Sequence, residues 1–86
     1  MDATQSFKEK LDGEYQWPAL YTFKFIAPAD MVSKVKELFP THEILEKKSS
    51  KGNYISLTIN FMARDSDQVI EYYLKVHALG GGVISL

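Results

Sequence analysis

The 86-residue chain contains no cysteine, so disulfides and thiolate chemistry are excluded. It also has no apolar run near the ~20 residues that span a bilayer. Its first residues, 1–13, are polar and of mixed charge, which is not the pattern of a secretory signal. These absences predict a cytoplasmic protein that does not associate with membranes.

Neither sign of charge dominates, since 10 basic and 11 acidic residues give a formal net charge of -1. A balance near zero provides no general attraction to nucleic acid. The composition, with 45% hydrophobic and 24% charged residues, is that of an ordinary globular protein. We therefore expect one domain over residues 1–86, with residues 1–16 as an N-terminal extension. In this extension Phe7 and Leu11, spaced i, i+4, favour a short helix over 4–12 that Gly13 ends.

Alternation of apolar and polar residues predicts two strong strands, over 20–27 and 54–62. Two weaker segments, 42–48 and 83–86, are expected at the edges of the sheet, and the turn 49–53 predicts a hairpin.

Two helices are predicted between the strands. The first follows Pro28, with Asp30 as its N-cap and Pro40 at its end. The second begins at 65–68 and ends at the three glycines 80–82. Its buried stripe is expected to contain Val69, Tyr72, Tyr73, Val76 and Leu79.

The resulting order is β-α-β-β-α-β. We predict an α+β fold, a ferredoxin-like two-layer sandwich with a four-stranded antiparallel sheet and both helices on one face. Strand parity assigns the covered face to Tyr21, Phe23, Phe25, Ile55, Leu57, Ile59 and Phe61, and leaves Thr22, Lys24, Ser56, Thr58 and Asn60 on the open face. RNA-recognition domains of this topology stack bases on open-face aromatics. Here only Tyr54 is aromatic on that face, so we expect no nucleic-acid partner.

No set of side chains predicts catalysis, a cofactor or a metal. His42 and His77 lie on different elements without a second histidine at ligand spacing. Asp65 and Asp67 are explained as helix-start residues, and Glu43 and Glu46 as part of a solvated edge strand. We therefore predict a protein that is not an enzyme.

Two groups of residues are candidates for binding. The first is the hairpin segment Lys47, Lys48, Ser49, Ser50, Lys51, Gly52 and Asn53, where lysines and turn amides form a possible site for an anion or a partner. Lysines that protect an edge strand from aggregation explain the same pattern. The second group is Ile70, Leu74 and His77, which lie beside the buried stripe of the second helix and suit a partner or self-association if exposed.

The hairpin Ser49–Tyr54 and the strand Ile55–Phe61 resemble those of the YbeD-like proteins of bacteria, as do Tyr21–Lys24 and Gln68-Val69. The resemblance covers roughly residues 17–86. It implies a ferredoxin-like domain of unknown function, similar in shape to ACT regulatory domains. Those domains bind amino acids between domains, near a glycine after the first strand. The connection Ala27–Asp30 has no glycine and departs from that pattern.

These features together favour a small non-catalytic regulatory or adaptor domain that binds a protein partner or itself. The alternative is an ACT-like sensor that holds a small-molecule metabolite at a dimer interface.

Overall fold

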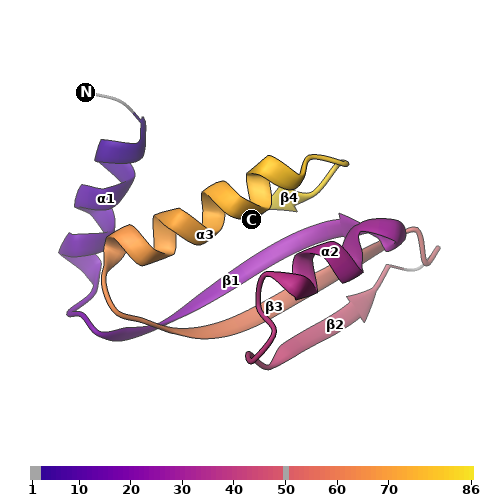
Figure 1. Ribbon diagram of the computed structural model, residues 1–86, viewed down its shortest axis with the longest axis horizontal. Helices are drawn as coiled ribbons and strands as arrows, with labels where there is room; N and C mark the ends of the chain where they lie inside the picture. The colour runs from indigo at the N-terminus through magenta and orange to yellow at the C-terminus, as the bar shows by residue number, and fades with distance from the viewer. Residues whose placement is uncertain (1–2, 50) are drawn as a thin grey trace.

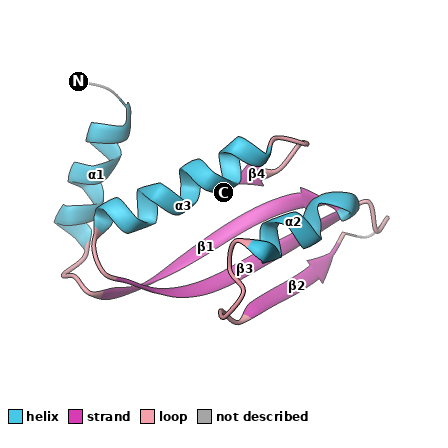
Figure 2. Cartoon of the chain, in the orientation of Figure 1, coloured by secondary structure: helices cyan, strands magenta, loops and turns pink. Residues whose placement is uncertain are grey.

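The structure, a computed structural model, describes residues 3–49 and 51–86 (Figures 1 and 2). Its elements in chain order are α1 (Ala3–Glu14), β1 (Ala19–Pro28), the 3-10 turn η1 (Ala29–Met31), α2 (Val32–Glu37), β2 (Ile44–Lys48), β3 (Tyr54–Ala63), α3 (Ser66–Leu79) and β4 (Ile84–Ser85). Within the described ranges, no helix is both long and apolar enough to cross a membrane.

The strands form one four-stranded antiparallel sheet in the order β2-β3-β1-β4. β1 and β3 pair over ten residues each, from Ala19 with Ala63 to Pro28 with Tyr54. β2 and β4 are the shorter outer strands. The predicted α+β fold with a four-stranded antiparallel sheet is confirmed, and the strand order is compatible with the ferredoxin-like arrangement.

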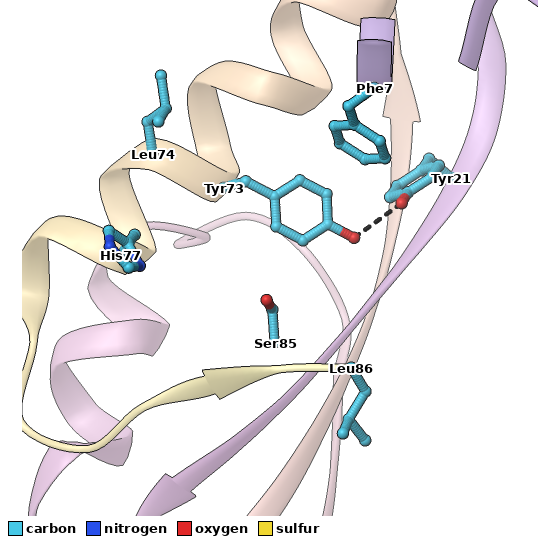
Figure 3. Close-up of a pocket in the computed structure, with 7 residues that line it drawn as sticks. All are labelled: Phe7, Tyr21, Tyr73, Leu74, His77, Ser85 and Leu86. Carbon is cyan, nitrogen blue, oxygen red and sulfur yellow. Dashed lines mark hydrogen bonds between the residues drawn. The ribbon is translucent and has the colours of Figure 1, made fainter. Parts of the chain in front are cut away.

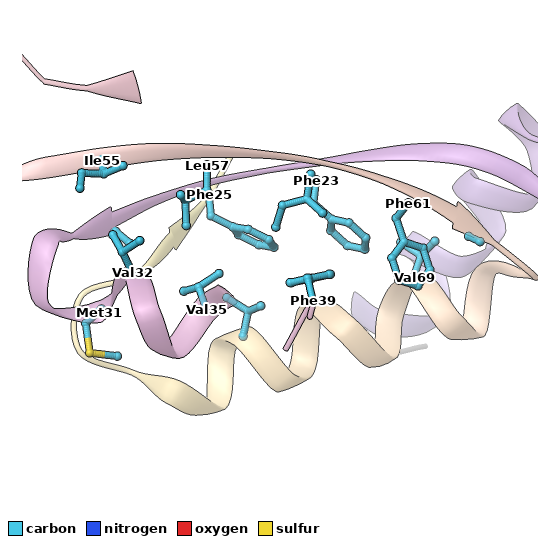
Figure 4. Close-up of a cluster of buried hydrophobic side chains, with 14 of the residues drawn as sticks. Phe23, Phe25, Met31, Val32, Val35, Phe39, Ile55, Leu57, Phe61 and Val69 are labelled. Carbon is cyan, nitrogen blue, oxygen red and sulfur yellow. The ribbon is translucent and has the colours of Figure 1, made fainter. Parts of the chain in front are cut away.

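The core lies between the sheet and the helices α2 and α3 (Figure 4). Phe23, Phe25, Leu57 and Ile59 are fully buried, as strand parity predicts. Val35 of α2 and Val69 of α3 join the same cluster, so both helices cover this face. Burying each such side chain contributes about 1.5–3 kcal/mol, which makes this face the main source of stability.

The start of the first predicted helix differs from the prediction. Asp30 lies inside the 3-10 turn, and no side chain caps the start of η1 or α2. The prediction of Asp30 as an N-cap is therefore wrong. The reason is that the turn begins directly after Pro28, so Asp30 is already past the position from which a carboxylate reaches the first free amides.

The second predicted helix has the expected ends. Asp65 Oδ1 accepts a hydrogen bond from Gln68 N at 2.9 Å. Gly80 follows the helix with a φ of 62° and donates its N–H to His77 O. A positive φ of this size favours glycine, so the predicted end of the helix at the glycines is confirmed. The ψ of Gly80, −137°, lies outside the left-handed helical region of the expected cap.

The N-terminal helix is longer than the predicted short helix and continues through Gly13 to Glu14. It packs across the start of α3 (Figure 1). Leu11 is only 3% exposed. Lys8 Nζ lies 2.9 Å from Ser66 Oγ and 3.1 Å from Asp67 Oδ1. Residues 3–14 therefore extend the core of the domain.

Candidate functional site

The lysine hairpin joins β2 to β3. Lys47 and Lys48 end β2, Ser49 follows, and Lys51, Gly52 and Asn53 form an exposed turn. Gly52 has a φ of 73°, as the predicted hairpin requires. Ser50, the remaining member of the predicted group, lies outside the described residues.

Three backbone amides of the hairpin are used in hydrogen bonds within it. Ser49 N donates to Tyr54 O at 2.9 Å, and Gly52 N donates to Ser49 O at 3.0 Å. Tyr54 N donates to Ser49 Oγ at 3.3 Å. These three amides are therefore not available to an anion, and any anion here would depend mainly on the lysine side chains.

A cavity of about 420 Å³ lies beside the hairpin and is lined by Ile26, Lys47, Lys48, Ser49, Tyr54 and Ser56. Ser56 pairs with Ile26 on β1 and with Lys47 on β2. Because cross-strand partners share a face, this row lies on the side of the sheet away from the helices. The sequence predicts the hairpin residues of this cavity but not Ile26 on β1.

The open face carries more apolar surface than the sequence prediction recognises. Its exposed apolar side chains come from every strand and are Leu20, Leu45, Tyr54, Met62 and Ile84. The signal was present, because the alternation that exposes Thr22 and Lys24 also exposes Leu20. Apolar residues that cluster on one exposed face indicate a binding surface.

The charged side chains on this face are basic. Lys24 pairs with Thr58, and Lys47 pairs with Ser56, so both lie with the polar open-face residues. The one acidic strand residue, Glu46, alternates to the helix side and forms an ion pair with Lys36 at 2.6 Å. Within the described strands, the open face is therefore positive.

The second predicted group is divided by the structure. Leu74 is 57% exposed and His77 is also exposed, but Ile70 is only 8% exposed. Ile70 lies between Ser66 and Tyr73, the α3 residues that contact Lys8 and Phe7 of α1. Ile70 is therefore buried, on the part of α3 that packs against α1, and does not meet the condition of exposure on which it was a candidate interface residue.

A second cavity, of about 440 Å³, lies between α1, α3 and the junction of β1 with β4 (Figure 3). Its lining residues are Phe7, Tyr21, Tyr73, Leu74, His77, Ser85 and Leu86. The hydroxyl oxygens of Tyr21 and Tyr73 are 2.7 Å apart. Leu74 and His77 belong to the predicted interface group. The sequence does not predict the cavity itself, because its other residues come from distant parts of the chain.

The two tyrosines have raised pKa values. Partial burial raises the pKa of the Tyr73 hydroxyl, and its hydrogen bond with Tyr21 raises it further. Burial is also the main cause of the raised pKa of Tyr21. Both hydroxyls are therefore neutral donors and acceptors near pH 7, rather than sources of a phenolate.

The remaining histidine and acidic side chains lie apart from the two cavities or serve the fold. In residues 3–49 and 51–86, no group of three or more His, Asp or Glu side chains is placed to hold a metal ion. His42 stacks on Phe61, with 4.5 Å between ring centroids, and so serves packing. Asp65 serves as the cap of α3.

Residues 12–82 match the family described as "Protein of unknown function (DUF493)". The chain belongs to this family. The match covers most of the chain, from the end of α1 to the glycines after α3. It confirms the predicted YbeD-like relationship.

A curated relative supports membership of the DUF493 family. This "UPF0250 protein" of Buchnera aphidicola subsp. Baizongia pistaciae (strain Bp) is 30% identical over 76 residues, covering 80% of this chain and 86% of the relative. No solved structure matches the chain significantly. Neither family name indicates a catalytic activity.

Proposed function

We propose that this member of the DUF493 family is a small non-catalytic adaptor or regulatory domain that binds a protein partner through the open face of its sheet. The observation that carries the proposal is the set of exposed apolar side chains contributed by all strands of that face. Leu20 and Met62 are paired at one end of this face, Tyr54 and Ile84 lie toward the other end, and polar pairs lie between them. Exposed apolar side chains gathered on one face favour a protein interface.

The charge of this face supports an acidic partner surface. Lys24 and Lys47 lie on the face, and Lys51 extends from the adjoining turn. The cavity beside Lys47 has an apolar floor that includes Ile26 and Tyr54. A partner segment with one apolar side chain near carboxylates complements this arrangement.

Site-specific photo-cross-linking tests the surface directly. A photo-reactive amino acid at Leu45, on the open face, is expected to cross-link a partner in cells. The matched position is Ser33, which is exposed on α2 on the other side of the sheet. Equal cross-linking from both positions, or from Ser33 alone, would rule out the open face as the interface.

Charge reversal tests the role of the lysines. We expect Lys47→Glu with Lys51→Glu to abolish partner capture, because both charges would then repel an acidic surface. The unfolding free energy should change by less than about 0.5 kcal/mol, since both side chains are exposed. Lys10→Glu with Lys34→Glu makes the same change in net charge on the helix side. Capture that survives the first variant would remove the hairpin from the proposal.

The metabolite-sensor alternative and the cytoplasmic location stay predictions. A thermal-shift screen against amino acids and nucleotides, with the mass in solution measured alongside, distinguishes a sensor from an adaptor. A ligand at about 100 times its dissociation constant adds roughly 2.7 kcal/mol, which such a screen detects.

A further inference from the structure

β1 has a vacant edge along half its length. On one side, β3 pairs with all ten of its residues. On the other side, β4 pairs only with Phe25 and Ile26, and Leu86 N donates to Lys24 O at 2.9 Å. Among the described residues, no strand continues this row beside Ala19–Phe23.

The antiparallel hydrogen-bond pattern between β1 and β4 shows which backbone groups of β1 face the vacant side. In an antiparallel pair, every second residue directs its N–H and C=O toward the same neighbour. Because Lys24 O accepts from Leu86, the backbone groups of Thr22 and Leu20 also point to the β4 side. No other described segment forms a backbone hydrogen bond with them. Within residues 3–49 and 51–86, these groups therefore have no backbone partner on this side.

This edge lacks the usual protection against pairing. The outer strand β2 carries Glu46, Lys47 and Lys48, and charged residues of this kind discourage further pairing. The stretch Ala19–Phe23 contains no charged residue. The first lysine of β1, Lys24, lies just after this stretch, where its backbone oxygen already accepts a hydrogen bond from Leu86 N.

The 440 Å³ cavity lies along the vacant row, on the helix side (Figure 3). Tyr21, Ser85 of β4 and Leu86, which directly follows β4, all contribute to its lining. A strand that continues the β4 row would place alternate side chains on the helix side, opposite Tyr21 and Phe23. The side chain opposite Tyr21 would enter the cavity next to Phe7 and Tyr73.

We propose that this edge binds an extended peptide segment of a partner protein by strand addition. The peptide runs antiparallel to β1, in line with β4, and places an apolar side chain in the cavity. Free backbone donors and acceptors in a row complement another polypeptide backbone, which selects a peptide over a nucleic acid or lipid. Side chains two residues apart in the peptide supply specificity.

A second copy of the chain fits this edge less well than a peptide. Its own β1 edge is vacant only over Ala19–Phe23, and beyond that its β4 occupies the row. Two copies could therefore pair over only a few residues before β4 of one copy clashed with the chain of the other. A flexible peptide turns away beside Leu86 without this restriction.

N-methyl scanning of a bound peptide provides the test. Heptapeptides are selected from a display library against the full chain, and binders are expected to carry apolar residues at alternate positions. In the best binder, methylating an amide that faces Leu20 or Thr22 removes a backbone hydrogen bond and should weaken binding about tenfold. Methylating the intervening amides should change binding less than about threefold. A scan without this alternation, or a library without such binders, overturns the proposal.

A pair of variants locates the peptide. Leu20→Lys places a charge on the vacant edge and should weaken binding about tenfold. Met62→Lys is the matched control, because Met62 pairs with Leu20 and is similarly exposed, at 63% against 56%. Equal effects, or a dimer that Leu20→Lys converts to monomer, would overturn the peptide assignment. The site shares Leu20 with the open face but lies apart from its hairpin end. Lys47→Glu with Lys51→Glu should therefore abolish partner capture and leave heptapeptide binding unchanged, which distinguishes a failure of one proposal from a failure of the other.

Discussion

At the residue scale, the hydroxyl pair of Tyr21 and Tyr73 joins β1 to α3 beside the vacant edge. The two oxygens are 2.7 Å apart in a half-buried setting. One hydroxyl donates to the other, so the accepting tyrosine keeps its own O–H proton. The pair therefore fixes Tyr73 over the cavity and leaves one donor for a further partner.

We expect Tyr73→Phe to lower the unfolding free energy by about 0.5–1.5 kcal/mol, because Tyr21 loses its partner. The double variant, Tyr21→Phe with Tyr73→Phe, should lose less unfolding free energy than the two single variants added together, because neither hydroxyl is then left without its partner. Urea unfolding of the four proteins measures this coupling. Strictly additive effects would show that the hydrogen bond contributes nothing to stability.

The same pair predicts a pH dependence. Both pKa values are raised above the ordinary 10.0 in the folded chain, so the folded state holds these protons more tightly than the unfolded state. The contribution of these two raised pKa values to the unfolding free energy is complete below about pH 10 and is lost as the pH rises further. Between pH 9 and pH 11, about the range in which free tyrosine titrates, the unfolding free energy of the double Phe variant should fall less than that of the unchanged protein.

At the element scale, the end of α3 depends on its glycines. Gly80 and Gly81 have φ values of 62° and 65°. A Cβ at Gly81 would lie 2.6 Å from Sδ of the buried Met31, whereas a Cβ at Gly80 would meet nothing within 4 Å. The connection from α3 to β4 therefore packs directly on η1. Of the two glycines, only Gly81 lies where a side chain would collide with a neighbour.

Gly81→Ala should therefore destabilise the chain more than Gly80→Ala. Both alanines carry the cost of a positive φ, on the order of 1–3 kcal/mol. Gly81→Ala also forces Met31 to move. Thermal unfolding of the two variants makes the comparison, and equal melting temperatures would mean that Met31 moves aside freely.

At the scale of the whole molecule, α1 is the element that completes the domain. It buries Leu11, covers Ile70 of α3 and supplies Phe7 to the cavity. Most of α1 precedes residue 12, where the match to the DUF493 family begins. The cavity beside β1 is therefore built partly by a segment outside the matched region.

We expect Leu11→Ala to cost about 2–5 kcal/mol, the usual loss for a large apolar side chain removed from a core. That is a large fraction of the roughly 5–15 kcal/mol that stabilises a typical domain. Lys10→Ala, at the exposed neighbour, should change stability by less than about 0.5 kcal/mol. If the two variants behave alike in urea unfolding, α1 is a loosely attached extension.

The sequence by itself determined the features that depend on neighbours within a few residues. Alternation along β1 and β3 decided which face is buried, because successive side chains of a strand point to opposite sides. Asp65 and Gly80 decided the ends of α3, because capping is a local hydrogen-bonding and backbone requirement. The lysine hairpin was readable for the same reason.

Only the tertiary structure decided how distant segments meet. Ile70 is buried on the part of α3 that packs against α1, whereas helical spacing alone left its exposure open. The pairing of Ile26 with Ser56 and of Ser56 with Lys47 formed the cavity of the open face. The vacant edge of β1 follows from the unequal lengths of β1 and β4 and from their register. These features depend on contacts between residues far apart in the chain, and periodicity within one segment carries no information about such contacts.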